Sequence, residues 1–122
     1  MNTQTLPDRD YQAFLQQGRF MIQHSASSGR HVFYPRSVAP GTGAEDLEWV
    51  EASGRGVVYS TTVVRAKPPA VSYNVALIEL EEGPRLMSRV ENIDPSVVQI
   101  GMPVRARIAR EENLAFVVFD PA

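Results

Sequence analysis

Few residues in this 122-residue chain could carry out covalent or metal chemistry. The sequence contains no cysteine and only two histidines, His24 and His31. A cysteine nucleophile, a disulfide and thiolate metal ligands are therefore excluded. There is also no Gly-x-Ser-x-Gly, no glycine-rich phosphate loop and no His-x-x-x-His pair, the spacings that position a nucleophile, a nucleotide or a metal ion. The sequence predicts no catalytic residues, and we interpret both histidines as surface or locally hydrogen-bonded side chains.

Charged residues provide the remaining candidates. Acidic residues cluster at 45–48 and at 79–82, where solvated turn edges are a simpler interpretation than acid/base pairs. Arg55 lies between Gly54 and Gly56. Its side chain could reach a phosphate or a carboxylate of a partner, or it could be an ordinary turn arginine.

The composition is that of a soluble globular protein, with 43% hydrophobic and 21% charged residues. The net charge is −2, and the 12 basic residues are spread along the chain. Proteins that bind nucleic acid usually concentrate basic residues on one face, so this pattern argues against such a role. No apolar run approaches the roughly 20 residues that span a bilayer. Residues 1–20 do not resemble a signal peptide, and we expect a cytoplasmic location.

The N-terminal region predicts one short helix over residues 7–18. Proline suits its first turn, Asp8 and Asp10 favour the helix dipole, and Gly18 suits the position after its end. Tyr11, Phe14 and Leu15 share one face at helical spacing. That face packs either on the rest of this chain or on another protein.

Residues 19–47 are rich in small residues, and a short apolar segment at residues 32–36 separates two small-residue clusters. Composition alone indicates a long loop, and loops of this length in small domains are usually functional or disordered.

From residue 48 onward the pattern is that of β-strands. Ser53–Gly56 predicts a turn, and residues 57–64 are almost all β-branched or aromatic. Regular alternation would place Val57, Tyr59, Thr61 and Val63 on one face and the intervening residues on the other.

Four further strands are expected at residues 71–80 (VSYNVALIEL), 85–90, 103–110 and 114–119, with a short helix at 94–101. In the strand 103–110, Val104, Ala106 and Ile108 should face inward. Five strands with a helix between the third and fourth follow the order of an OB-fold barrel.

The sequence resembles a family of proteins associated with acyl-CoA enzymes. Its members join an N-terminal helix, a rubredoxin-like zinc ribbon and a C-terminal OB-fold. Their characteristic segments are Gln-Arg-Cys-x-x-Cys-Gly, an aromatic residue followed by Pro-Arg, Cys-Pro-x-Cys-Gly, Glu-Trp and Ser-Gly-x-Gly-x-Val-Tyr-Ser. The matching segments in this chain are, in the same order, residues 23–29 (QHSASSG), 33–36 (FYPR), 39–43 (APGTG), 47–49 (LEW) and 53–60 (SGRGVVYS).

The resemblance implies a mainly β fold with three parts: an N-terminal helix (1–18), a ribbon module (19–47) and a five-stranded OB-fold barrel (48–122). The four cysteine positions of the family are occupied here by Ser25, Ser28, Ala39 and Thr42. Structural zinc needs four good donors, and these residues supply no thiolate. We therefore expect a degenerate, metal-free ribbon without zinc or another cofactor.

The resemblance also implies a non-catalytic accessory subunit. Its expected partner is a thiolase-like or related acyl-CoA enzyme that supplies the catalytic residues, and acyl-CoA would be met only through the complex. Neither a nucleic-acid nor a membrane partner is expected. The alternative from another class is a stand-alone OB-fold module that binds single-stranded nucleic acid. Candidate partner contacts are Tyr11, Phe14, Tyr34, Pro35, Arg36, Trp49 and Arg55; Trp49 could instead have a core role.

Overall fold

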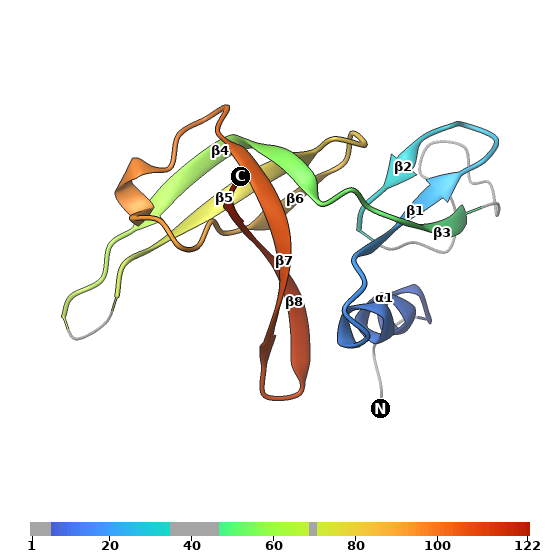
Figure 1. Ribbon diagram of the computed structural model, residues 1–122, viewed down its shortest axis with the longest axis horizontal. Helices are drawn as coiled ribbons and strands as arrows, with labels where there is room; N and C mark the ends of the chain where they lie inside the picture. Colours follow the sequence, from blue (N-terminus) through green and yellow to red (C-terminus); the bar gives the residue numbers. More distant parts are fainter. Residues whose placement is uncertain (1–5, 35–46, 69–70) are drawn as a thin grey trace.

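The computed structural model describes residues 6–34, 47–68 and 71–122, which form one helix followed by two antiparallel sheets (Figure 1). The helix, α1, spans Leu6–Gln16. The first sheet has the order β2-β1-β3, with β1 at Met21–Ser25, β2 at His31–Val32 and β3 at Leu47–Glu51. A helix and a small sheet thus precede the barrel, as the resemblance implied.

The helix ends close to where the sequence predicted. Gly18 has φ +79°, and the Arg19 N–H donates to the Phe14 carbonyl oxygen at 2.9 Å. Glycine adopts this left-handed conformation without steric cost, so it can follow the last helical turn and reverse the chain into β1.

The second sheet contains the five strands of the barrel in the order β6-β5-β4-β7-β8. Their bounds are Arg55–Val64 (β4), Tyr73–Leu80 (β5), Arg85–Ser88 (β6), Pro103–Glu111 (β7) and Leu114–Pro121 (β8). The predicted short helix is a single 3-10 turn, η1 (Pro95–Val97), which Asp94 caps by accepting from the Ser96 N–H. The predicted OB-fold order is confirmed.

A side-chain amide helps to close the barrel between β6 and β8. The buried Asn74 donates through Nδ2 to the Val90 carbonyl oxygen at 2.7 Å and accepts from the Val90 N–H at 2.8 Å. Val90 then forms a parallel bridge with Phe119. Asn74 therefore takes the place of a main-chain partner at the seam of the nearly closed barrel.

The prediction of regular alternation along β4 is wrong beyond Val58. The pairing with β5 shifts between Val58 and Ser60, which marks a β-bulge. Val58 lies opposite the buried Ile78, and Thr61 lies opposite the buried Ala76. One extra residue reverses which side chains face inward, so Thr61 and Val58 share the inner face. In contrast, the predicted burial of Val104 on β7 is confirmed.

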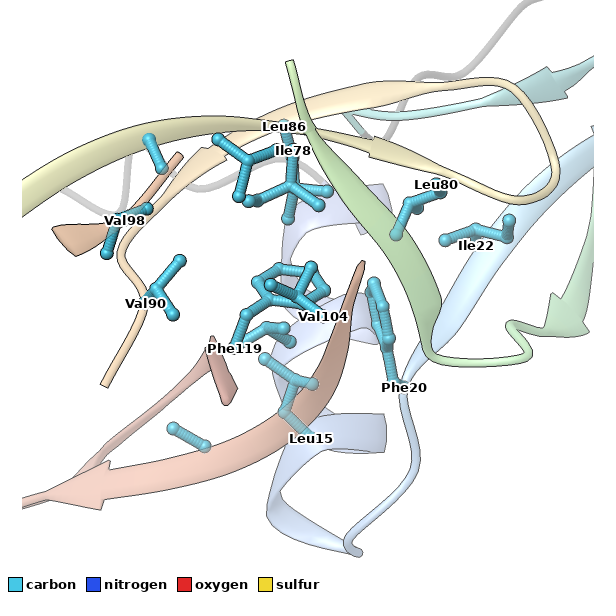
Figure 2. Close-up of a cluster of buried hydrophobic side chains, with 14 residues drawn as sticks. Leu15, Phe20, Ile22, Ile78, Leu80, Leu86, Val90, Val98, Val104 and Phe119 are labelled. Carbon is cyan, nitrogen blue, oxygen red and sulfur yellow. The ribbon is translucent and has the colours of Figure 1, made fainter. Parts of the chain in front are cut away.

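The hydrophobic core includes residues from before and after residue 48. Leu15 of α1 and Phe20 lie in the same buried cluster as Val104 and Phe119 of the barrel (Figure 2). The helix therefore packs on its own chain through Leu15, one of the two alternatives left open by the sequence.

The strand β3 links the two parts of the fold. It pairs with β1 from Met21↔Glu51 to Ser25↔Leu47, so residues 47–51 complete the N-terminal sheet. The predicted barrel, residues 48–122, includes most of this segment. The predicted boundary between ribbon module and barrel at residue 48 stays a prediction. By its pairing, β3 belongs with the ribbon strands.

Candidate partner-contact surfaces

Aromatic side chains join α1 to the small sheet. The Tyr11 ring packs edge-on against Phe33 at a centroid distance of 5.5 Å and lies parallel to Trp49 at 6.5 Å. Phe14 packs edge-on against the same Trp49 ring at 5.3 Å. Burial raises the pKa of the Tyr11 phenol above its usual value, consistent with a packing role. Three predicted contact residues thus meet one another, and each is only partly exposed.

Tyr34 points instead toward the barrel. It is exposed, and its hydroxyl accepts a hydrogen bond from the Met87 N–H at 3.3 Å. Its ring lies 4.7 Å from Phe33, so the end of the ribbon segment connects the aromatic cluster to β6. Pro35 and Arg36, predicted with Tyr34, lie outside the described residues.

Arg55 is paired with one carboxylate of its own chain, that of Glu81. Its Nε lies 2.9 Å from Glu81, and both side chains are largely exposed. Exposed ion pairs of this kind contribute little to stability because water screens them. This pairing favours the turn-arginine interpretation, and a contact between Arg55 and a partner stays a prediction.

The first knuckle of the ribbon forms a tight turn without metal. The Gly29 N–H donates to the Ser25 carbonyl oxygen at 2.8 Å, and the Ser28 N–H approaches the Ser25 hydroxyl oxygen at 3.4 Å. Ser25 is buried, so its hydroxyl lies inside the turn. Ala39 and Thr42, the other two positions, lie outside the described residues.

The donor set of this knuckle does not fit structural zinc. Neutral hydroxyls are poor ligands compared with thiolates, and they already serve local hydrogen bonds. Among residues 6–34, 47–68 and 71–122, no group of three His, Asp or Glu side chains is placed to hold a metal. The expectation of a zinc-free chain stays a prediction.

The edge of β8 is completed by side chains of α1. The Gln12 amide donates through Nε2 to the Ala115 carbonyl oxygen at 3.0 Å, and its Oε1 accepts from the Ala115 N–H at 2.8 Å. Gln16 donates to the Asn113 carbonyl oxygen at 3.0 Å. An open strand edge invites unwanted pairing, and here the helix covers it.

A charge network crosses the barrel seam beside Val90. Arg107 contacts Glu91 at 2.6 Å and Asp120 at 2.9 Å, and Arg89 contacts Glu91 at 2.6 Å. Hydrogen bonds from Arg107 lower the pKa of Asp120. Burial raises the pKa of Glu91, but Arg107 and Arg89 outweigh this effect and hold it below the usual value. Both carboxylates are therefore ionised partners of structural arginines.

Sequence reasoning missed the apolar residues on the outer surface of β4, β5 and β6. Tyr59, Tyr73 and Met87 are all exposed there. A signal was present in VSYNVALIEL, because apolar or aromatic residues occupy alternate positions on both faces of this segment. Strands with one solvated face usually alternate between apolar and polar residues.

The family model described as "ChsH2, C-terminal OB-fold domain" matches residues 49–109. The chain belongs to this family. The solved structure named "Ltp2-ChsH2(DUF35) aldolase" contains a chain similar to this one, with TM-score 0.84, 34% identity, and coverage of 99% of this chain and 98% of that one. The ChsH2 family assignment thus agrees with the fold along almost the entire chain.

Two curated relatives share the ChsH2-like sequence. A "Probable enoyl-CoA hydratase alpha subunit" of Thermomonospora curvata is 39% identical over 110 residues, 87% of this chain and 34% of that relative. A "DUF35 domain-containing scaffold protein" of Pyrococcus furiosus is 31% identical over 88 residues, 69% of this chain and 65% of that relative. The chain thus matches about a third of the first relative's length and just under two thirds of the second's. No helix in the described part of the chain is long and apolar enough to cross a membrane.

Proposed function

We propose that this chain is a non-catalytic accessory subunit of an enzyme complex that acts on acyl-CoA thioesters. The observation that carries the proposal is its likeness, over almost its whole length, to a chain of the structure named as an Ltp2-ChsH2 aldolase. The names of the relatives, a hydratase alpha subunit and a scaffold protein, support the same type of role.

The electrostatics of the described residues support an accessory role. General acids and bases work best when their pKa lies near the working pH. The perturbed carboxyls here shift the other way: Asp94, Asp120, Glu81 and Glu91 all have lowered pKa values and stay ionised. Their partners are arginines and the serines Ser53 and Ser96, which indicates structural roles. The reacting groups would therefore belong to the partner.

A thiolase-like enzyme is the partner that we propose within this class. The resemblance of the sequence to accessory subunits of thiolases and thiolase-like aldolases motivates this choice. The name of the similar aldolase structure is consistent with carbon–carbon bond chemistry on the partner. A hydratase partner is the variant suggested by the relative from Thermomonospora curvata.

Affinity purification from the native host tests the proposal. The tagged chain should co-purify with an acyl-CoA enzyme in a fixed ratio, and the complex should catalyse aldol cleavage, thiolysis or hydration of an acyl-CoA. The isolated chain should show no turnover of acetoacetyl-CoA or crotonyl-CoA. Turnover that is proportional to the concentration of the repurified chain would contradict the accessory role.

The alternative of a nucleic-acid-binding OB-fold has less support. Arg85 and Arg89 lie beside aromatic rings on the barrel, a combination that can stack bases. However, Arg85 is 3.6 Å from Glu79, and Arg89 is 2.6 Å from Glu91. Carboxylates at these positions would repel a phosphate backbone.

A further inference from the structure

The strand β5 has apolar side chains on both faces, and the barrel interior covers one of them. Ala76, Ile78 and Leu80 face inward and are buried. The alternate residues Tyr73, Val75, Leu77 and Glu79 face outward. The first three are apolar, with Tyr73 48% exposed, and Glu79 at the end of the row is paired with Arg85 at 3.6 Å. A strand that is apolar on both faces is typical of a sheet covered on both sides. The pattern therefore indicates that something packs on the outside of β5.

Neighbouring strands extend this outer apolar surface. Met87 on β6 lies opposite Leu77 in the ladder and is 61% exposed. Tyr59, at the bulge of β4, lies under the Arg85 guanidinium, 3.8 Å from the ring centroid. We call this surface the outer face: Val57, Tyr59, Tyr73, Val75, Leu77 and Met87. Contiguous exposed apolar residues of this kind mark interaction surfaces more often than isolated ones do.

A hollow of about 320 Å³ adjoins the outer face, with Tyr73, Val75, Met87, Arg89 and Phe116 in its lining. Hot spots in interfaces often consist of one side chain inserted into such a hollow. The hollow is mostly apolar, and its arginine is already paired with Glu91 at 2.6 Å. An apolar or aromatic side chain fits this lining better than a phosphate or another free anion does.

We infer that the outer face is the surface on which the catalytic subunit docks. This inference rests on the proposed function. A chain similar to this one over 98% of its length occurs in a structure named for two proteins, which favours a different protein over a second copy. The competing aromatic surface is occupied within the chain, because Tyr11 and Phe14 both contact Trp49. A polar rim around an apolar centre is typical of a protein–protein interface. Here the charged residues beside the outer face are paired, Arg85 with Glu79 and Arg89 with Glu91.

Arginine substitutions in the purified complex test the inference. Tyr73→Arg and Met87→Arg each place a charge on the outer face, and each should weaken binding of the catalytic subunit at least tenfold. Leu114→Arg is the matched control, because Leu114 is 56% exposed at the start of β8 and lies outside the outer face. It should change binding less than twofold. Circular dichroism and melting temperature identify any variant that fails to fold.

A cross-linking measurement does not depend on disruptive substitutions. With p-benzoylphenylalanine at position 73, ultraviolet light should link this chain to the catalytic subunit, whereas the same group at position 114 should not. The inference would be overturned if only position 114 linked to the catalytic subunit, or if position 73 linked only to a second copy or within its own chain. It would also be overturned if single-stranded DNA blocked the cross-link from position 73. If no acyl-CoA enzyme co-purifies, the proposed function fails as well. If it co-purifies and binds the arginine variants normally, only the docking surface is wrong.

Discussion

Two side-chain amides, Asn74 and Gln12, stand where a neighbouring strand would supply main-chain hydrogen bonds. Each pairs with both the N–H and the carbonyl oxygen of one residue, Val90 and Ala115 respectively. An amide can do this because it carries a donor and an acceptor side by side. These roles were not predicted from the sequence, because a polar residue within a helix or strand does not reveal which distant residue it meets.

Replacing Gln12 should show how much this pairing contributes. Gln12→Ala leaves the N–H and carbonyl oxygen of Ala115 without their partner, and we expect the free energy of unfolding to fall by about 1–3 kcal/mol. Gln17→Ala, just beyond the helix, is the control and should stay within about 0.5 kcal/mol of the wild type. Urea unfolding followed by circular dichroism measures both. Equal effects from the two substitutions would contradict the role of the amide.

The bulge in β4 predicts different results for the same substitution at two adjacent threonines. The Thr61 hydroxyl is buried and has no hydrogen-bond partner among the described residues. A methyl group of similar shape removes this cost, so Thr61→Val should stabilise the protein by about 1 kcal/mol. Thr62 is exposed, and Thr62→Val should have little effect. Chemical denaturation separates the two outcomes, and a destabilised Thr61→Val would contradict the assigned inward face.

The charge network predicts a pH dependence of known sign. Arg107 lowers the pKa of Asp120 in the folded protein, whereas an unfolded aspartate titrates at about 3.9. The resulting stabilisation is full above the unfolded pKa and is lost as the pH falls through the folded pKa. The stability difference between wild type and Arg107→Met should therefore shrink as the pH is lowered.

Denaturation curves at several pH values from neutral to acidic measure this difference. Arg110→Met on the same strand is the control, because Arg110 donates to the main-chain carbonyl oxygens of Leu15 and Gln16 and lies opposite Ala115 rather than Asp120. Its effect should not depend on pH. A constant difference for Arg107→Met would show that Asp120 titrates equally in both states.

At the scale of elements, turn residues and strand composition predicted most of the barrel. Gly18 and Asp94 correctly marked the end of a helix and the start of a short one, because their roles are local. The bulge could not be predicted from residues 57–64, because the side chains there are compatible with both the inner and the outer face of a strand. The pairing of β3 with β1 was missed for a different reason, because strand partners depend on contacts distant in sequence.

The knuckle of the ribbon predicts that a metal site can be restored. Ser25 and Ser28 already share one tight turn, as a pair of zinc ligands would. The combined change Ser25→Cys, Ser28→Cys, Ala39→Cys and Thr42→Cys should bind about one zinc per chain, with Zn–S distances near 2.3 Å. Zinc should also raise its melting temperature relative to the chelated protein.

The wild type, purified in the same way, should contain no stoichiometric zinc. Metal analysis and melting curves compare the two proteins. A folded quadruple variant without zinc would show that the second pair of positions does not approach the first.

At the scale of the whole molecule, dispersed charge predicts no affinity for nucleic acid. The net charge is −2, and the arginines of the barrel seam are paired with carboxylates. Fluorescence anisotropy with single-stranded DNA and RNA should therefore show no binding at physiological salt, since such binding depends on clustered cations. Micromolar binding with a steep salt dependence would instead support the nucleic-acid alternative.

Candidate contacts were less predictable than the fold. Aromatic residues such as Tyr11 and Trp49 are common both in cores and in interfaces. Which role each one has depends on the residues that surround it in the folded protein. Residue type alone therefore identified the aromatic cluster but not its internal packing. The outer face could not be predicted from the sequence, because an apolar strand indicates a contact surface only when the structure shows which of its faces is left exposed.

The pairing of Gln12 with Ala115 also constrains the order of events during synthesis. These residues are 103 positions apart, so α1 leaves the ribosome long before β8 exists. Closing a loop of this length costs chain entropy, which only the completed long-range contact offsets. Until β8 has been synthesised, the helix lacks Ala115 as a hydrogen-bond partner, and Leu15 lacks the part of its apolar cover that β8 supplies. A nascent chain that has not yet reached β8 therefore leaves apolar surface of α1 exposed, and such surface is what chaperones bind.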